Sequence, residues 1–245
     1  MKVFDKTHFI SNWIKNYVLT MPSKAESLVI GISGGIDSSV SSTLSAMTGL
    51  KTIVLSMPIK QKSKEHDLSL KHQEWLIRKF KNVEAHTVNL DKLFESFKNS
   101  LSKFENDHGM ANSRARLRMT TLYQVAAANK GIVVGTGNKV EDFGVGFYTK
   151  YGDGGVDISP IADCNKTDVW EMGRELNILK EIIDAAPTDG LWDDGRTDEG
   201  QLGLKYSELE EAMNNPNSLN REKYEKIRKL NLHKMEPIPV CKIPN

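Results

Sequence analysis

Cysteine is scarce in this chain of 245 residues, which contains only Cys164 and Cys241. The two lie far apart and form no C-x-x-C pair, so the sequence predicts neither a disulfide framework nor a cysteine-rich metal site. Long apolar runs are also lacking, and none approaches the roughly 20 residues of a membrane-spanning helix. The N-terminal residues lack the apolar core and cleavage site of a signal peptide. We therefore expect a cytoplasmic protein that acts without a membrane.

An excess of charge of one sign is absent too. Lys and Arg number 33 and Asp and Glu number 32, which leaves a formal net charge of +1. That balance excludes a protein held on nucleic acid by its overall charge, although not one with a local basic patch. Hydrophobic residues make up 39% of the chain and charged residues 27%, as in ordinary globular proteins. With no internal repeat or linker, residues 1–245 are predicted to form a single domain.

Short apolar runs alternate with helical patterns along the first half of the chain. The patterns predict strands at 27–32, 51–56, 83–88 and 131–136, and helices at 7–20, 39–47, 66–80, 90–104 and 112–129. Such alternation is typical of an α/β fold, here a doubly wound parallel sheet with helices on both faces. Ligands of these sheets bind at the carboxyl ends of the strands, where strand order reverses. Because Ser33 and Thr136 both lie at such ends, we expect them to face one crevice.

Two stretches, 137–160 and 186–200, are rich in turn residues and poor in helical pattern. Long loops inside a compact domain are usually functional, so we expect both to act as lids over the crevice. Trp192 lies in the second stretch and is a candidate to pack over a ligand. Three other tryptophans fall in helical patterns and are predicted to lie in the core: Trp13, Trp75 and Trp170.

The most informative motif is Ser33-Gly-Gly-Ile-Asp-Ser38, which stands between a predicted buried strand and a predicted helix. Its glycines let backbone N–H groups approach an anion, and the helix N-terminus adds partial positive charge, so the segment suits phosphate binding. It is not a Walker A loop, because no lysine closes it. Asp37 would repel a phosphate unless it holds a bridging Mg²⁺. The alternative is a tight turn in which Ser33 caps the helix.

The motif resembles the pyrophosphate loop of the N-type ATP pyrophosphatases, which cleave ATP between its α- and β-phosphates. Further blocks make nearly the whole chain similar to the ammonia-dependent NAD synthetases. These blocks are Ala115–Met119, Gly135–Glu141, Phe147–Asp157, Ala186–Thr188 and the pair His233-Lys234. The resemblance implies an adenine nucleotide alpha hydrolase-like fold. It also implies amidation of deamido-NAD with ammonia through an acyl-adenylate, which gives NAD, AMP and pyrophosphate.

The resemblance also implies roles for individual residues, with ATP as co-substrate and Mg²⁺ as cofactor. The residues that would bind ATP are Gly31, Ile32, Ser33, Gly34, Gly35, Ile36, Asp37, Ser38, Thr136, Lys166 and Thr188. Asp37 and Glu141 would hold Mg²⁺ and, with Lys166, would be catalytic. The residues that would bind deamido-NAD are Arg116, Lys150, Asp157, His233 and Lys234. The family is also homodimeric, and helices 7–20 and 112–129 are candidates for the interface.

The charged side chains have physical interpretations of their own. Lys150 and Lys166 bracket part of the first lid, and we expect both to be free to close on phosphates. On the helix at 112–129, Arg114 and Arg118 share a face, whereas Arg116 points elsewhere.

Departures from the family pattern leave the substrate open. Gly135-Thr-Gly-Asn138 stands where NAD synthetases often have Gly-Thr-Asp-His, and Leu55-Ser-Met-Pro58 also differs. The segment between Glu141 and Lys150 is one residue longer than in many relatives. Nicotinate mononucleotide therefore stays an alternative to the dinucleotide. Free ammonia is the expected nitrogen source, because the chain has no room for a glutaminase domain, although a separate glutaminase partner stays open.

Two other classes of protein could use the same loop and are alternative interpretations of the sequence. A tRNA-thiolating ATP pyrophosphatase would need reactive cysteines and a basic RNA-binding face, for which the sequence offers little. A nucleotide-binding sensor would hold ATP without turning it over, and the presence of both Asp37 and Glu141 disfavours it.

Overall fold

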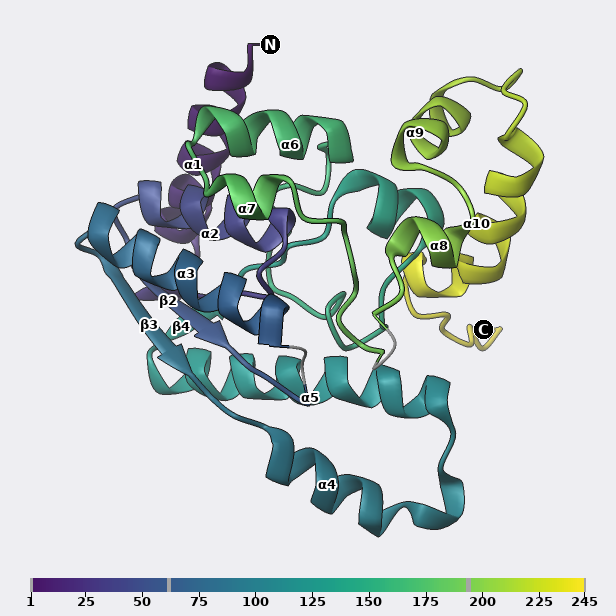
Figure 1. Ribbon diagram of the computed structural model, residues 1–245, viewed down its shortest axis with the longest axis horizontal. Coiled ribbons are helices and arrows are strands. Elements are labelled where there is room, and N and C mark those ends of the chain that lie inside the picture. The colour runs from purple at the N-terminus through teal and green to yellow at the C-terminus, as the bar shows by residue number, and fades with distance from the viewer. Residues whose placement is uncertain (1, 61–62, 193–194, 245) are drawn as a thin grey trace.

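The computed structural model describes residues 2–60, 63–192 and 195–244, and its centre is a parallel sheet with the strand order β3-β2-β1-β4 (Figure 1). Strands and helices alternate along the first half of the chain, as predicted. The elements of this half are α1 (Val3–Thr20), β1 (Ser27–Gly31), α2 (Ile36–Met47), β2 (Lys51–Ser56), α3 (Ser63–Lys79), β3 (Val83–Thr87), α4 (Asp91–Ser100), the 3-10 turn η1 (Ser102–Phe104), α5 (Asp107–Ala128) and β4 (Gly131–Val133).

The register of the sheet places the strand-order reversal beside β1. Ser27 of β1 pairs with Lys51 of β2 on one side and with Gly131 of β4 on the other, all in parallel. The chain thus winds outward through β2 and β3 and then returns to the far side of β1. The carboxyl ends of β1 and β4 therefore lie next to each other, which is where such folds bind ligands.

Helices cover both faces of the sheet, because alternate residues of a strand point to opposite sides. Leu28 and Ile30 of β1 pack into one hydrophobic cluster with residues of α1, α2, α3 and α6, and Val29 packs into a second cluster with residues of α4 and α5. Figure 1 shows these two layers on either side of the strands. The predicted doubly wound architecture is confirmed.

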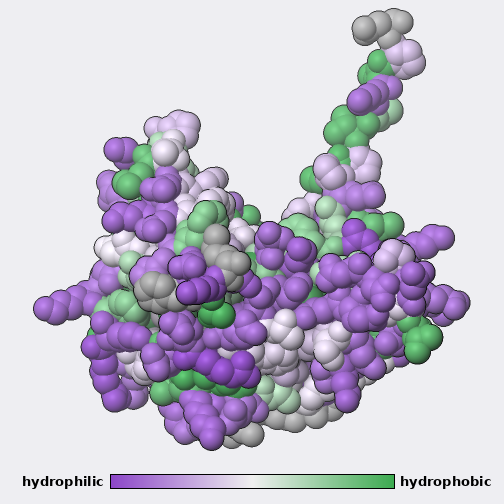
Figure 2. Space-filling model, turned by 90° about the horizontal axis from the view of Figure 1, so that it is seen from above, coloured by the Kyte–Doolittle hydropathy of each residue, from purple (hydrophilic) through white to green (hydrophobic). Residues whose placement is uncertain are grey.

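The second half of the chain adds α6 and α7 to the layer of α1 and α2, and a separate group of helices beside them. The elements of this half are the π-helical turn η2 (Lys139–Val145), α6 (Lys166–Glu175), α7 (Lys180–Ile183), α8 (Asp198–Leu202), α9 (Tyr206–Asn214) and α10 (Arg221–Met235). A third hydrophobic cluster joins η2, α8, α9 and α10, with Tyr206 and Tyr224 buried inside it. Beyond α10, the last described residues stand away from the body, and Figure 2 shows hydrophobic residues along this projecting segment (upper right).

Several predicted boundaries are wrong. The first helix begins at Val3, and β4 ends at Val133, after which Val134 continues only as a single bridge to Ile158. The helix predicted at 90–104 is split into α4 and η1, and the one predicted at 112–129 begins at Asp107. Both predicted lids contain helical turns, η2 and α8.

Trp13 is also not a core residue, since 41% of it is exposed. It lies on the outer face of α1, whereas Trp75 and Trp170 are partly buried against the core as predicted. Across the described ranges, no helix has the length and apolar character needed to cross a bilayer.

Candidate active site

The predicted phosphate loop connects β1 to α2 in a tight turn. Gly34 has a φ of +92°, a left-handed conformation that favours glycine, and Gly35 is the N-cap of the 12-residue helix α2. The Gly35 N–H donates to Oγ of Ser33 at 3.2 Å, and that Oγ lies 3.1 Å from Oγ of Ser38. Ser39 donates to the Gly35 carbonyl at 2.9 Å. The turn therefore holds hydroxyl and N–H groups in fixed positions at a helix N-terminus, which is an anion-binding arrangement.

A buried lysine joins the two predicted metal-binding carboxylates. Nζ of Lys166, the first residue of α6, lies 2.5 Å from Oδ2 of Asp37 and 2.9 Å from Oε1 of Glu141. Burial alone would lower the pKa of Lys166, but attraction to both carboxylates outweighs it and the net pKa is raised. The ammonium is thus charged at neutral pH. The expectation that Lys166 is a free lid lysine is wrong, because its side chain is only 1% exposed.

Asn138 and Tyr206 hold the same carboxylates from other sides. Asn138 donates from Nδ2 to Oδ1 of Asp37 at 3.0 Å, while its own Oδ1 caps η2 by accepting the N–H groups of Val140 and Glu141 at 3.1 Å. The Tyr206 hydroxyl donates to Oε1 of Glu141 at 2.5 Å. Burial opposes ionisation of Glu141, yet Lys166 and Tyr206 hold its pKa below the usual value. The carboxylates of Asp37 and Glu141 are therefore both held in place around the ammonium of Lys166.

One cleft contains every residue that the sequence predicted to bind ATP. The loop from Gly31 to Ser38 lines it together with Thr136, Glu141, Lys166 and Thr188. The prediction that Ser33 and Thr136 face one crevice is confirmed. Met57, Ala115 and Leu122 add apolar surface, so the cleft combines a polar phosphate end with apolar walls.

The cleft offers two carboxylates, Asp37 and Glu141, as protein ligands for Mg²⁺. Among the described residues, no group of three or more His, Cys, Asp or Glu side chains is arranged to hold a metal ion. Mg²⁺ commonly uses only one or two carboxylates and takes its other ligands from substrate phosphates and water. Asp37 and Glu141 supply two carboxylates beside a phosphate loop, and Oε1 of Glu141 and both oxygens of Asp37 already accept hydrogen bonds. The residues fit a Mg²⁺ that arrives with the nucleotide.

The predicted dinucleotide-binding residues fall into two places, and neither is in the wall of the cleft. Arg116 donates from Nε to the Lys150 carbonyl at 3.2 Å, and Lys150 donates from Nζ to the His233 carbonyl at 3.1 Å. Lys234 next to it donates from Nζ to the Tyr148 carbonyl at 2.8 Å. Arg116, Lys150, His233 and Lys234 thus form one group at the end of α10.

Asp157 is separate from that group. It accepts the Val133 N–H of β4 at 2.7 Å and the Tyr123 hydroxyl at 3.0 Å, so it ties the 147–157 segment to the end of the strand. Its predicted role toward a substrate stays a prediction. Trp192, the candidate ligand cover, lies under the guanidinium of Arg196 at 4.1 Å, and its role toward a ligand also stays a prediction.

Several side chains of the cleft wall were not among the predicted site residues. Arg118, which shares the inner face of α5 with buried Arg114, lines the cleft, whereas Arg116 is exposed on the outer face. Asp142, Asp153 and Asp198 also line it, and burial raises the pKa of Asp153 to about 6. Asp153 lies inside the block 147–157 that resembles the family, and this resemblance could have identified it as a site residue. Asp198 belongs to the stretch read as a lid, and nothing local marked it.

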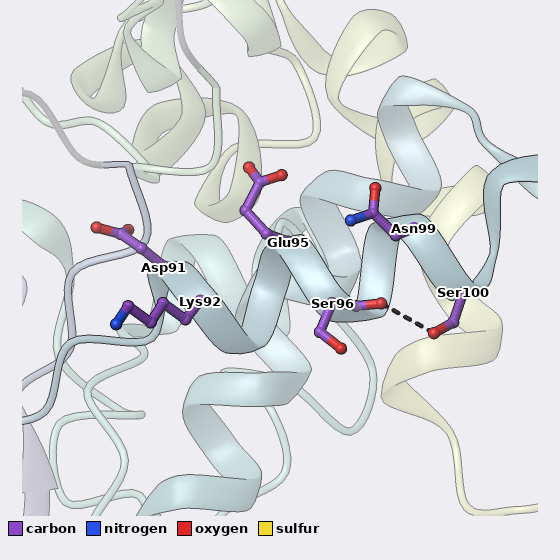
Figure 3. Close-up of a pocket in the computed structure, with 6 residues that line it drawn as sticks. All are labelled: Asp91, Lys92, Glu95, Ser96, Asn99 and Ser100. Atoms are coloured by element: carbon purple, nitrogen blue, oxygen red, sulfur yellow. Dashed lines mark hydrogen bonds between the residues drawn. The ribbon is translucent and has the colours of Figure 1, made fainter.

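A second depression lies on α4, and Figure 3 shows its side chains along one helix. Its contacts are within α4 and to Lys60. Ser100 donates to the Ser96 carbonyl at 2.9 Å, and Glu95 forms an exposed ion pair with Lys60. None of the loop residues takes part, so this depression is separate from the cleft.

The fold and the cleft together define an α/β protein whose glycine-rich loop lies where strand order reverses, the place where nucleotide-binding α/β folds hold their ligands. Residues 7–243 match the family model described as NAD synthase, and the chain belongs to this family. The expected family is thereby confirmed.

Individual relatives agree with this assignment. Two relatives named NH(3)-dependent NAD(+) synthetase come from Carboxydothermus hydrogenoformans (37% identical, 84% of this chain and 83% of the relative) and Mesoplasma florum (39% identical, 86% and 84%). A solved structure of NMN synthetase from Francisella tularensis superimposes with a TM-score of 0.90, at 32% identity over 99% of this chain and 100% of that chain.

Proposed function

We propose that this chain is a ligase that amidates the nicotinate carboxylate of deamido-NAD with ammonia at the expense of ATP. The products are NAD, AMP and pyrophosphate. The observation that carries the proposal is the convergence of the Ser33–Ser38 loop with Asp37, Lys166 and Glu141 in one cleft. Family membership supports the same reaction, because relatives that match most of the chain are named NH(3)-dependent NAD(+) synthetase.

The chemistry explains why such a cleft is needed. A carboxylate does not acylate ammonia, because its leaving group would be an oxide. In the first step, a carboxylate oxygen of the nicotinate attacks the α-phosphorus of ATP, and the bond to the pyrophosphate oxygen breaks. In the second step, the ammonia nitrogen attacks the acyl carbon, the bond to the AMP oxygen breaks, and the nitrogen loses a proton. No protein nucleophile is required.

The residues of the cleft act by positioning and by charge. The N–H and hydroxyl groups of the loop bind the phosphates, and the charged Lys166 lies beside them to stabilise the departing pyrophosphate. A Mg²⁺ held by Asp37 and Glu141 would neutralise phosphate charge when it is bound. Arg116, Lys150, His233 and Lys234 form a basic group suited to the phosphates of a pyridine nucleotide.

The oligomeric state of the protein is also part of the proposal. We infer a homodimer, because three aromatic residues of α1 are exposed on one face (Phe9, Trp13 and Tyr17) and apolar residues of the C-terminal segment are exposed as well (Ile238, Val240 and Ile243). Light scattering over a concentration series tests this. Free ammonia as nitrogen source and a cytoplasmic location stay predictions.

A second candidate substrate is nicotinate mononucleotide. It is favoured by the similarity to a protein named NMN synthetase over the whole chain. The deciding experiment incubates the protein with ATP, Mg²⁺ and ammonium, adds either nucleotide in parallel, and compares kcat/KM for amide and AMP formation. A preference for deamido-NAD supports the proposal, and a preference for the mononucleotide replaces the substrate but keeps the chemistry. AMP release that needs RNA, or no AMP at all, contradicts both.

A further inference from the structure

Tyr206, the first residue of α9, is buried but makes polar contacts inside the cleft region. It is 1% exposed, its ring lies under Nζ of Lys166 at 4.7 Å, and its edge packs against Trp170. Its hydroxyl lies 2.5 Å from Oε1 of Glu141 and 3.1 Å from Oδ2 of Asp198. The phenol therefore bridges the carboxyl groups of Glu141 and Asp198, which are distant from each other in the sequence.

Asp198 in turn is tied to the segment that precedes it. Its N–H donates to the Pro187 carbonyl at 3.1 Å, and Pro187 is the neighbour of Thr188 in the cleft wall. The Tyr206 N–H donates to Oε1 of Glu199, so α8 is attached to α9 at two points. A continuous path of hydrogen bonds thus runs from the Pro187 carbonyl through Asp198 and Tyr206 to Glu141.

The Tyr206 hydroxyl is the donor toward both carboxyl groups. A phenol has one proton, and the shorter contact shows that it goes to Glu141. Oδ2 of Asp198 lies on the other side of the same hydroxyl, as a second acceptor at 3.1 Å. Burial, with added repulsion from Glu141, raises the pKa of Asp198 to about 7. Oδ1 of Asp198 is buried without a hydrogen-bond partner among the described residues.

We propose that Tyr206 and Asp198 are positioning residues that set the Glu141 carboxylate and the 186–188 segment relative to each other. In this arrangement, the nucleotide-contacting segment and the carboxylate that would hold Mg²⁺ are fixed as one unit. The inference rests on the ATP-binding part of the proposed function. It does not depend on which nicotinate nucleotide is amidated.

The test measures binding of ATP and Mg²⁺ without any nicotinate nucleotide, so that no turnover takes place. We expect Tyr206→Phe to raise the Mg²⁺ concentration for half-maximal ATP binding by roughly 10- to 100-fold, the usual effect of losing a partner that orients a metal ligand. Asp198→Ala is expected to act in the same direction. Asp198→Asn is expected to retain most of the affinity, because its amide keeps a hydrogen bond to the Tyr206 hydroxyl.

The matched control is Tyr224→Phe. Tyr224 is a second tyrosine of the same hydrophobic cluster, 3% exposed, whose hydroxyl donates to the Gly144 carbonyl at 3.2 Å and not to Glu141. It removes an equally buried hydroxyl, so it reproduces any loss of stability but leaves the Mg²⁺ dependence unchanged. Equal Mg²⁺ shifts in Tyr206→Phe and Tyr224→Phe, or equal losses in the Asn and Ala variants of Asp198, would overturn the inference. Wild-type protein that binds Mg²⁺ and ATP but amidates neither nucleotide would contradict the proposed function alone.

Discussion

The ammonium of Lys166 lies 2.5 Å from Oδ2 of Asp37, a contact between residues that are 129 positions apart. It exists because α6 packs closely on α2. Gly173 permits this approach, since a Cβ at that position would lie 2.6 Å from Cδ1 of Ile36. The charged centre of the cleft is therefore fixed by the packing of two helices that begin at the cleft.

The first prediction concerns the free energy of unfolding after Lys166→Met. This change removes the charge but keeps most of the volume, and it leaves Asp37 and Glu141 buried without their cation. Breaking a buried pair in this way costs roughly 3–5 kcal/mol. Urea denaturation measures the loss. Lys139→Met is the matched control, because Lys139 pairs with Asp163 at the surface, where such a pair is worth at most about 1 kcal/mol. Equal losses in the two variants would show that Lys166 carries no buried charge.

Asp37→Ala is expected to separate catalysis from folding. Lys166 keeps Glu141 as a partner, so circular dichroism should report an intact fold. Pyrophosphate release in the presence of ATP, Mg²⁺, ammonium and nucleotide should fall by at least about 100-fold, because a group that stabilises charge on the phosphates is lost. Asp163→Ala, at an exposed carboxylate, should release pyrophosphate at the wild-type rate. Turnover retained in Asp37→Ala would contradict the assignment of Asp37 to the metal.

The sequence predicted what is local and missed what depends on distant packing. The phosphate loop was predictable, because its glycines, the strand before it and the helix after it are adjacent in the chain. The parallel sheet followed from alternation of strands and helices. The burial of Lys166 was not predictable, since it requires the contact between α6 and α2. Tyr206 was not singled out in the sequence, because its partner Glu141 is distant in the chain.

The unusual Gly135-Thr-Gly-Asn138 segment gains a physical reason. A Cβ at Gly137 would lie 1.9 Å from Oδ2 of Asp142, so the carboxyl of Asp142 fills the space that a side chain at 137 would take. We expect Gly137→Ala to lower the free energy of unfolding by roughly 1–3 kcal/mol, the usual cost of overpacking. In an Asp142→Ala background, the same change should cost almost nothing. A double-mutant cycle by urea denaturation measures this coupling. Additive losses would mean that the two positions do not compete for space.

His72 supplies a prediction about pH. It is fully buried, its Nε2 lies 3.1 Å from Oγ of Ser42, and its ring stacks on Trp75. Nδ1 has no hydrogen-bond partner within the part of the chain that the structure describes. Burial lowers the pKa of His72 from 6.5 to about 4. The native protein therefore keeps His72 neutral at a pH where the unfolded chain has already taken up a proton.

The sign of the effect on stability follows from this difference in proton uptake. The contribution of neutral His72 is fully present above pH 6.5 and is lost as the pH falls toward 4, because protons then favour the unfolded chain. Between pH 7 and pH 5 the loss amounts to about 2 kcal/mol. Urea denaturation at both pH values measures it. His72→Gln should remove this part of the pH dependence, whereas His86→Gln, at an exposed histidine, should keep it. An unchanged slope in His72→Gln would show that other groups cause the dependence.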